Sequence, residues 1–413
     1  MMPFPSPNDS CFSLPLSQTS ALALMNTLAN AGYETRLVGG CVRDALLGGV
    51  VQDMDLATTA KPDEMLKVLG AAGIKTVPTG IEHGTITAVM DGKGFEITTL
   101  REDVKTDGRH AEVRFTSDWE KDASRRDFTM NAMSQDAGGN LYDYFGGKSD
   151  ALAGRVRFVG IPAQRLQEDY LRLLRFFRFY AWHGREEPDA ATLADLKAAA
   201  PHLSTLSRER VWKEFSKMLA APDPSHSYML MLKLGVVDHL LPGADRLATM
   251  CSLISYEFMR KTSKAPNPLL RLAALLTGKK ANAADLQKRF AISNADTQKL
   301  GQYLANPLVF EGQFNAQNLS FCLYRYGFDL TEDFLVLAQA QAAQFHWESA
   351  RPVLEKWVPK SFPLRGDDVM ALGISPGPRL GEILEAVENW WMAQNFVPDR
   401  AACLNEAKRL IEE

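Results

Sequence analysis

The spacing of hydrophobic positions predicts a small mixed unit at the start of the chain. Apolar residues recur at helical spacing over 19–30, and short apolar runs typical of strands follow at 36–38, 53–57, 85–90 and 95–100. Gly32 is expected to end the first helix, and Asp91-Gly92-Lys93-Gly94 is expected to turn between the last two strands. Pro62 marks the first turn of a second helix. We therefore predict an α+β unit that extends to about residue 150.

Beyond residue 151 the strand patterns give way to long helical ones. The first two are QEDYLRLLRFFRFYAWHG at 167–184 and SRERVWKEFSKML at 207–219, where Ser207 is expected to be the N-cap. Prolines and glycines interrupt the helical pattern through the rest of the chain, and no internal repeat is evident. We therefore predict an all-helical part behind a loose, Pro- and Ser-rich leader and an α+β head. The expected divisions are 1–18, 19–150, 151–220 and 221–413.

The composition is that of a folded protein in an aqueous compartment. Of 413 residues, 46% are hydrophobic and 23% are charged, and no apolar run approaches the roughly 20 residues that span a bilayer. The first 35 residues lack the Lys or Arg that targeting segments carry, so a cytoplasmic location is expected. The five cysteines do not have the spacing of a zinc site and are expected to be reduced thiols. A net charge of −4 neither requires nor excludes a nucleic-acid partner.

Three carboxylates are expected to gather on one face of the predicted sheet. In DMDLA, Asp53 and Asp55 are two residues apart on a strand and would therefore project together. On a neighbouring strand, Glu96 alternates with Phe95 and Ile97 and is available as a third carboxylate. Clustered carboxylates repel one another unless a cation is present. This arrangement suits one or two Mg²⁺ ions, which can activate an attacking oxygen and stabilise a leaving one in phosphoryl transfer.

Two further stretches carry residues suited to holding a nucleotide. Gly39 and Gly40 leave room for a triphosphate beside the backbone, and Arg43 follows as a charged clamp. In SRRDFTMNAM, Arg125 and Arg126 next to Asp127, with Asn131 one helical turn later, could bind triphosphate and ribose, although a helix start with a local ion pair accounts for this stretch equally well. A DxD pair or a Gly-Gly turn alone is more often solvated surface or an ordinary turn. The whole set favours a nucleotide site.

Five ordered motifs give the sequence a resemblance to the class II nucleotidyltransferases. They are GGCVRD at 39–44, DMD at 53–55, TDGRH at 106–110, RRDFTMN at 125–131 and EDYLRLLR at 168–175. The likeness is strong over about 20–220 and returns in FPLRGDDVMALGISPGP at 362–378, which is similar to the tail of CCA-adding enzymes. The family comprises bacterial and eukaryotic CCA-adding enzymes and bacterial poly(A) polymerases.

The resemblance implies a polymerase-beta-like head over 19–150, a helical neck with a base-selecting helix over 151–220, and a tRNA-binding body and tail over 221–413. It implies a Mg²⁺-dependent enzyme that transfers CMP, CMP and AMP from CTP and ATP to the 3′ end of tRNA, releasing pyrophosphate. The implied catalytic carboxylates are the metal ligands Asp53 and Asp55, supported by Glu96. The implied nucleotide-binding residues are Gly39, Gly40, Arg43, Arg126, Asn131, Asp169, Arg172, Arg175 and Arg178.

A continuous helix over 167–184 would explain how bases are chosen without a template. Asp169 and Arg172 are then neighbours on one face, with Arg175 near them and Arg178 turned away. A carboxylate accepts from the exocyclic amine of cytosine or adenine, and a guanidinium donates to the adjacent ring nitrogen or carbonyl. Uracil and guanine place a carbonyl there instead, a mismatch that can discriminate by about 10⁴. Taken by itself, the pair would be an ordinary surface ion pair.

Three alternative functions are weighed. A poly(A) polymerase shares the head but typically carries a strongly basic tail, whereas this chain ends in LIEE. A CC-adding or A-adding partial enzyme is a second alternative, although the charged loop over 101–115, expected to be mobile, looks complete, and CC-adding enzymes shorten it. A non-catalytic RNA-binding protein on the same fold would have no need of the intact carboxylates.

Overall fold

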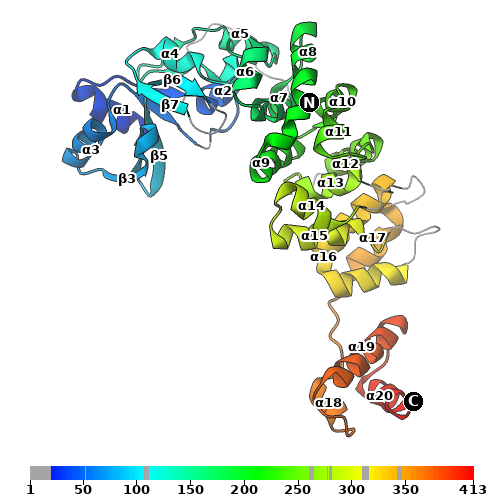
Figure 1. The fold of residues 1–413 in the computed structure, drawn as a ribbon. Helices are drawn as coiled ribbons and strands as arrows, with labels where there is room; N and C mark the ends of the chain where they lie inside the picture. Colours follow the sequence, from blue (N-terminus) through cyan, green and yellow to red (C-terminus); the bar gives the residue numbers. More distant parts are fainter. Residues whose placement is uncertain are drawn as a thin grey trace. The chain divides into compact units, whose positions relative to one another are not determined.

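The computed structural model describes residues 20–51, 53–106, 111–259, 265–276, 278, 281–308, 316–341 and 347–413 (Figure 1). Contacts within the chain divide it into two compact units, one up to Gly243 and the other from Ala244. The predicted leader over 1–18 lies outside the described residues, and the finer divisions at 150 and 220 remain predictions.

A seven-stranded mixed sheet is the frame of the first unit. Its strands lie in the order β3-β4-β5-β2-β1-β8-β9, in which β2 and β5 are parallel and the other neighbours are antiparallel. The strands are β1 Thr35–Val38, β2 Leu56–Thr58, β3 Lys75–Gly80, β4 Thr85–Met90, β5 Lys93–Thr99, β8 Ser134–Gln135 and β9 Leu141–Tyr142. A separate hairpin consists of β6 Arg101–Thr106 and β7 Ala111–Phe115. The predicted α+β head is thereby confirmed.

One face of the sheet carries an apolar row that runs across four strands. Registered neighbours on β1, β2, β5 and β4 are all buried: Leu37, Leu56, Ile97 and Ile86. Because side chains alternate along a strand, Glu96 points to the opposite face from Ile97. On that opposite face, Trp119 of helix α4 (Trp119–Ser124) packs against Val38 and Ala57. The predicted alternation of Glu96 with its buried neighbours is therefore confirmed.

Several local predictions for the head are confirmed. Helix α1 (Ser20–Asn30) ends before Gly32, and Pro62 opens helix α3 (Pro62–Ala71), which contacts α1 (Figure 1). Asp91 and Gly92 both have positive φ, 52° and 74°, and turn the chain between β4 and β5 as a hairpin requires. Turn residues and helix-opening prolines act locally, so the sequence alone is sufficient to place them.

The strand predicted over 53–57 is wrong at its start, because β2 begins only at Leu56. The partner strand β1 ends at Val38, where the chain turns at Gly39, so few ladder partners remain for the residues before Leu56. The carbonyl of Asp55 still accepts the Val38 amide at 3.0 Å. Asp53 and Asp55 therefore lie in the segment that leads into the strand, and both are exposed.

Helices make up the rest of the first unit. They are α2 Gly40–Leu46, α4 Trp119–Ser124, α5 Gly147–Ala153, α6 Pro162–Glu168, α7 Leu171–His183, α8 Ala190–Ala199, α9 Arg208–Leu219, α10 Ser225–Lys233 and α11 Val236–Leu240, with 3₁₀ turns η2 Ile81–His83, η3 Thr129–Asn131 and η4 Ala200–Thr205. Ser207 occupies the N-cap position of α9, although its side chain makes no capping hydrogen bond. The single helix predicted over 167–184 is wrong: α6 ends at Glu168 and α7 begins at Leu171.

The second unit is helical throughout its described residues, as predicted. Its helices are α12 Leu247–Met259, α13 Pro268–Leu275, α14 Ala283–Phe290, α15 Asn294–Leu304, α16 Ala316–Gln341, α17 Trp347–Lys356, α18 Gly366–Met370, α19 Pro378–Ala393 and α20 Arg400–Glu412. Gly327, with φ 74°, interrupts α16. Helices α18, α19 and α20 enclose an apolar core that includes Trp391 and Cys403.

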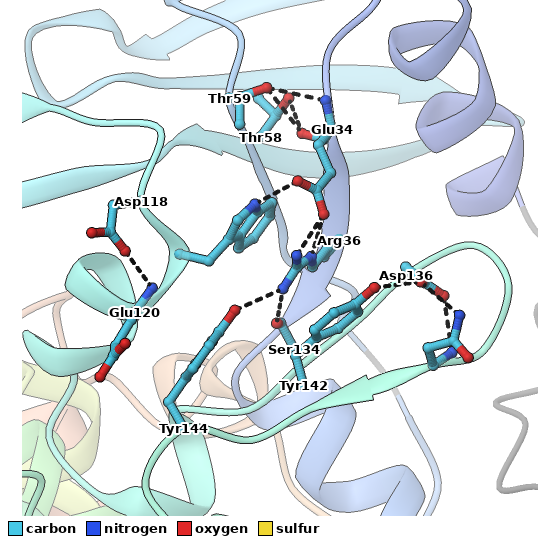
Figure 2. A network of polar contacts seen from close by, with 12 residues as sticks. Glu34, Arg36, Thr58, Thr59, Asp118, Glu120, Ser134, Asp136, Tyr142 and Tyr144 are labelled. Atoms are coloured by element: carbon cyan, nitrogen blue, oxygen red, sulfur yellow. Dashed lines mark hydrogen bonds and ion pairs between the residues drawn. The ribbon is translucent and has the colours of Figure 1, made fainter.

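A buried arginine fastens α4 to the sheet (Figure 2). Arg36 on β1 is only 5% exposed, and its guanidinium lies 4.1 Å from the ring centre of Trp119 and 3.5 Å from that of Tyr142. The guanidinium also donates to the side chains of Glu34, Ser134 and Tyr144. Trp119 in turn donates its ring N–H to Glu34 at 2.9 Å. This network holds the start of α4 against β1, one turn before Asp122.

Replacing Arg36 tests how far the fold relies on this network. Arg36→Ala is expected to lower the free energy of unfolding by about 3 kcal/mol, because it opens a void between two rings and removes charged hydrogen bonds. Urea denaturation followed by tryptophan fluorescence measures the change. Lys233→Ala is the control: its ion pair with Glu187 is 3.8 Å long and exposed, so its loss is expected to cost under about 0.5 kcal/mol. Equal effects for the two variants would contradict this interpretation.

Candidate active site

Gly39 and Gly40 form the turn between β1 and α2. Gly39 has φ 77°, in the left-handed region that favours glycine, and a Cβ placed there would lie 3.1 Å from a terminal nitrogen of Arg126. The Gly39 amide donates to the Met133 carbonyl at 3.2 Å, which ties this turn to the chain after Arg126. The glycine turn and the Arg126 guanidinium therefore lie side by side.

Arg43 is held in place from two sides. It is 9% exposed, and it donates to the Asp44 carboxylate at 2.8 Å and to the Asn131 side-chain oxygen at 2.6 Å. The Asn131 amide group donates to Asp127 at 3.1 Å. The alternative interpretation of the SRRDFTMNAM stretch, that it starts a helix, is wrong. Arg126 follows the end of α4, and Asn131 closes a 3₁₀ turn. Buried partners thus fix the Arg43 side chain in advance of any ligand.

Two of the three predicted carboxylates, Asp55 and Glu96, lie beside each other at the start of β2, and Asp53 lies two residues before Asp55. The parallel register of Leu56 with Ile97 places Asp55 beside Glu96. Partial removal from water raises the pKa of the Asp55 carboxyl, and the neighbouring Glu96 and Asp53 carboxylates raise it further, while Arg126 lowers it. The Asp55 carboxyl is therefore harder to ionise than an isolated one. The part of this shift that comes from the Glu96 and Asp53 carboxylates is the repulsion expected where a cation would bind.

No group of three His, Cys, Asp or Glu side chains is gathered tightly enough to hold a metal ion among the residues that the structure describes. The donors nevertheless fit a hard divalent cation. Asp53 and Asp55 are exposed, supply only oxygen, and repel each other and Glu96 in a way that a cation would relieve.

The sequence predicted that Asp169 and Arg172 lie on one helix, and this prediction is wrong. Its backbone is extended, with φ −154° and ψ 106°, between α6 and α7. One carboxylate oxygen accepts the Leu171 amide at 3.0 Å at the start of α7, and the other accepts a guanidinium N–H of Arg210 at 2.6 Å. The helical spacing of apolar residues continues through 167–184 and gives no sign of this break. One of the contacts that stabilise the break comes from Arg210 on α9, 41 residues away, which a local pattern cannot reveal.

The three predicted arginines of α7 all pair with acidic side chains, and Arg175 and Arg178 share Glu214. Arg172 pairs with Glu168 and donates to the Arg165 carbonyl at 2.7 Å. Arg175 donates to Asp127 at 2.9 Å, and Arg178 lies 3.0 Å from Glu214. Arg172 lies three residues after Asp169, and its backbone amide donates to the Asp169 carbonyl. Both reach one cleft, although the geometry that brings them there differs from the predicted helix face.

A cleft of about 660 Å³ brings most of the predicted residues together. Nine of the twelve line it: Gly39, Gly40, Arg43, Asp55, Arg126, Asn131, Asp169, Arg172 and Arg175. An adjoining cavity of about 160 Å³ is lined by Glu96 and again by Asp55 and Arg126. Asp53 and Arg178 line neither space. The larger cleft carries seven arginines and three aspartates, so its lining has an excess of positive charge that suits a triphosphate.

Several residues of this cleft are not among the nucleotide-binding residues that the resemblance implied. Arg101 and Arg125 line both spaces, and Asp127 and Arg210 line the larger one. Arg125 and Asp127 flank Arg126 in the RRDFTMN motif, so the motif itself was a usable signal. Arg101 stands at the start of the charged segment that was predicted to be a mobile loop, and nothing in its local sequence separates it from the other charges there. Residues 107–110 of that loop lie outside the described residues.

Comparisons with known proteins agree with this geometry. Residues 35–157 match the family described as "Poly A polymerase head domain", and residues 187–247 match "Probable RNA and SrmB- binding site of polymerase A". A "CCA tRNA nucleotidyltransferase 1, mitochondrial" of Danio rerio is 36% identical over 88% of this chain and 84% of its own length. A "CCA-adding enzyme" of Streptococcus mutans is 31% identical over 97% and 99%.

Solved structures show the same likeness. The Bacillus stearothermophilus CCA-adding enzyme in complex with CTP is 25% identical, with a TM-score of 0.75 over 97% of this chain and 99% of its own. A Thermotoga maritima CCA-adding enzyme complexed with tRNA shares the fold, with a TM-score of 0.65 over 94% of each chain. The fold and the cleft are thus those of a nucleotidyltransferase. The chain belongs to the family of CCA-adding tRNA nucleotidyltransferases, which depend on metal ions.

None of the helices in the described part of the chain is both long enough and apolar enough to cross a bilayer.

The pH dependence of stability tests the ion pair at the centre of the cleft. Burial alone would raise the pKa of Asp127, but Arg175 and hydrogen bonds from Asn131 and the Phe128 amide lower it on balance. A carboxyl with a lowered pKa stabilises the fold above the ordinary Asp pKa of about 3.9, and this contribution is lost as the pH falls through the folded-state value. Asp127→Asn is therefore expected to lower the free energy of unfolding by about 3 kcal/mol at pH 7.

The difference between Asp127→Asn and the unsubstituted protein is expected to shrink as the pH falls below about 4. Urea denaturation at pH 7, 5 and 3.5 measures it. Asp63→Asn, at an exposed position in α3, serves as the control. A constant difference across the series would show that the charge of Asp127 does not stabilise the fold.

Proposed function

We propose that this protein adds the sequence CCA to the 3′ end of tRNA, using CTP twice and ATP once. The observation that carries the proposal is the single cleft in which the glycine turn, the arginines and Asp169 with Arg172 lie around one nucleotide-sized space. Full-length similarity to CCA-adding enzymes supports the choice of reaction. Similarity of the head alone would also suit a poly(A) polymerase.

The phosphate end of the nucleotide is proposed to lie over the glycine turn. Gly39 and Gly40 let phosphate oxygens approach the backbone, and the Arg43 and Arg126 guanidinium groups beside the turn supply positive charge. Asn131 holds Arg43 and is proposed to reach the ribose. Partners within the protein hold these groups in position, so they lose little conformational freedom when the triphosphate binds.

Asp53, Asp55 and Glu96 are proposed to hold Mg²⁺ at the edge of this cleft. When bound, Mg²⁺ would polarise the reacting oxygens and neutralise charge on the phosphates. The 3′-hydroxyl of the tRNA attacks the α-phosphorus of the nucleotide; a P–O bond to the new nucleotide forms, the bond to pyrophosphate breaks, and the hydroxyl proton is released. The arginines of the cleft balance the negative charge of the pyrophosphate as it leaves.

Base choice is assigned to Asp169 and Arg172. The Leu171 amide and Arg210 hold the Asp169 carboxylate, yet its two oxygens offer about four acceptor positions, so it can also accept an amine of cytosine or adenine. Glu168 and the Arg165 carbonyl hold Arg172, which keeps donors for the neighbouring ring atom. Arg175 and Arg178 are proposed to support this pair through their own contacts.

The helical second unit is proposed to bind the acceptor stem and elbow of tRNA, largely through shape and phosphate contacts. A cytoplasmic location is proposed from the sequence, while several relatives carry the word mitochondrial in their names.

A nucleotide panel tests the function directly. The purified protein is incubated with Mg²⁺ and a tRNA transcript that lacks its last three nucleotides, and the products are resolved to single nucleotides. Growth by two with CTP, by three with CTP and ATP, and none with UTP or GTP is expected. Asp55→Asn is expected to lower the rate by at least about 10³, since it removes a metal ligand. Long products with ATP alone would indicate a poly(A) polymerase, arrest after two a CC-adding enzyme, and addition only to tRNA ending in CC an A-adding one.

Substitution of the base-reading pair tests template-free selection. Asp169→Ala is expected to lower the preference for CTP over UTP by about 10² or more, because the acceptor that distinguishes an amine from a carbonyl is gone. Relative kcat/KM values for CTP, ATP and UTP measure this. Asp195→Ala, at a half-buried position in α8 that lines neither cavity, is the control and should leave the preference unchanged. Unchanged selectivity in Asp169→Ala would move base reading to other residues.

A further inference from the structure

Asp122 is a buried carboxylate behind the nucleotide cleft with no assigned role. It lies on α4, is 3% exposed, and lines the smaller cavity together with Asp55 and Glu96. Its first oxygen accepts the Nε and Nη2 groups of Arg125 at 3.0 and 2.8 Å, and its second accepts Nη2 of Arg126 at 3.2 Å. One carboxylate therefore holds both arginines that follow α4.

The same carboxylate also reaches the base of the β6–β7 hairpin. The backbone amide of Arg101, the first residue of β6, donates to Asp122 at 3.2 Å. The Arg125 guanidinium completes the link, because it donates to the Arg101 carbonyl at 3.1 Å. Asp122 thus links α4 and the two arginines that directly follow it to the start of the hairpin, 21 residues earlier in the sequence.

Only one side of the Arg126 guanidinium is taken up by Asp122. Its other terminal nitrogen lies against the Gly39 turn, 3.1 Å from where a side chain at that position would begin. A single negative charge faces two guanidinium groups, so a net positive charge remains to bind phosphate. Without the carboxylate the two neighbouring cations would repel each other, and Arg126 would lose the hydrogen bond to Asp122 that holds it beside the turn.

From this arrangement we infer that Asp122 is a positioning residue for nucleotide binding, which holds Arg126 over the glycine turn so that it meets the triphosphate. The inference rests on the proposed function, since it assumes that the triphosphate lies at this turn. It predicts that loss of the Asp122 charge weakens the binding of phosphate groups and leaves base choice and tRNA binding unchanged.

The test compares Asp122→Asn with the unsubstituted protein. Asparagine has the same shape, but it loses the charge and places an N–H donor where a guanidinium already donates. The KM values for CTP and ATP and the inhibition constant of inorganic pyrophosphate are all expected to rise about tenfold, the effect of losing a charge-assisted hydrogen bond. The KM for tRNA and the preference for CTP over UTP are expected to change less than about twofold.

Asp118→Ala is the matched control. Asp118 caps the same helix through the amides of Glu120 and Lys121, but no contact links it to Arg126. This variant is expected to lower the melting temperature and leave all the constants unchanged. Asp122→Glu keeps the charge and is expected to restore most of the pyrophosphate binding, and it decides the question if Asp122→Asn does not fold.

Two outcomes would overturn the inference. The first is an Asp122→Asn variant whose constants match those of the unsubstituted protein while only its melting temperature falls, as in Asp118→Ala. The second is an equal rise in the KM for tRNA. Failure of the proposed function is distinguishable from both, because the unsubstituted protein would then add no nucleotide.

Discussion

The ion pair between Asp127 and Arg175 joins the two sides of the nucleotide cleft. Asp127 follows the arginines of the head, and Arg175 projects from helix α7. Burying a carboxylate is costly unless a cation and hydrogen bonds satisfy it, so this pair restricts how α7 can dock. The contacts continue from Asp127 through Asn131 to Arg43 beside the glycine turn. One connected set of polar side chains therefore relates the place where phosphates are proposed to bind to the place where the base is proposed to be read.

Acidic side chains also hold other arginines of the cleft in position. Four of the seven arginines that line the cleft have the following acidic partners: Asp44 for Arg43, Asp122 for Arg126, Glu168 for Arg172 and Asp127 for Arg175. These partners fix the donors in place, and the remaining positive charge is available to an anionic ligand. The exposed carboxylates at the start of β2 have the opposite imbalance, since Glu96 and Asp53 raise the pKa of Asp55. Phosphates would balance the positive charge of the arginines, and a cation would balance the negative charge of the carboxylates.

Sequence patterns predicted local turns and strand alternation better than they predicted the backbone around the candidate site. Hairpin turns, proline helix starts and the alternation of Glu96 with Ile97 are local effects, and they could be predicted. The break at Asp169 could not, because the periodicity of 167–184 is uninterrupted and the break is stabilised in part by Arg210 on another helix. Ion-pair partners were equally beyond reach: nothing in the sequence tells which carboxylate Arg175 or Arg178 will meet. Short strands such as β8 have too few residues to form a pattern.

A crystal structure of the protein with CTP and Mg²⁺ would test the central claim, that one rigid set of contacts holds the phosphate site and the base-reading pair together. The account predicts that the triphosphate lies over Gly39 and Gly40 beside Arg126, with the exocyclic amine of cytosine facing Asp169 and the Asp127–Arg175 pair intact. A triphosphate bound at the glycine turn with its base out of reach of both Asp169 and Arg172 would contradict it.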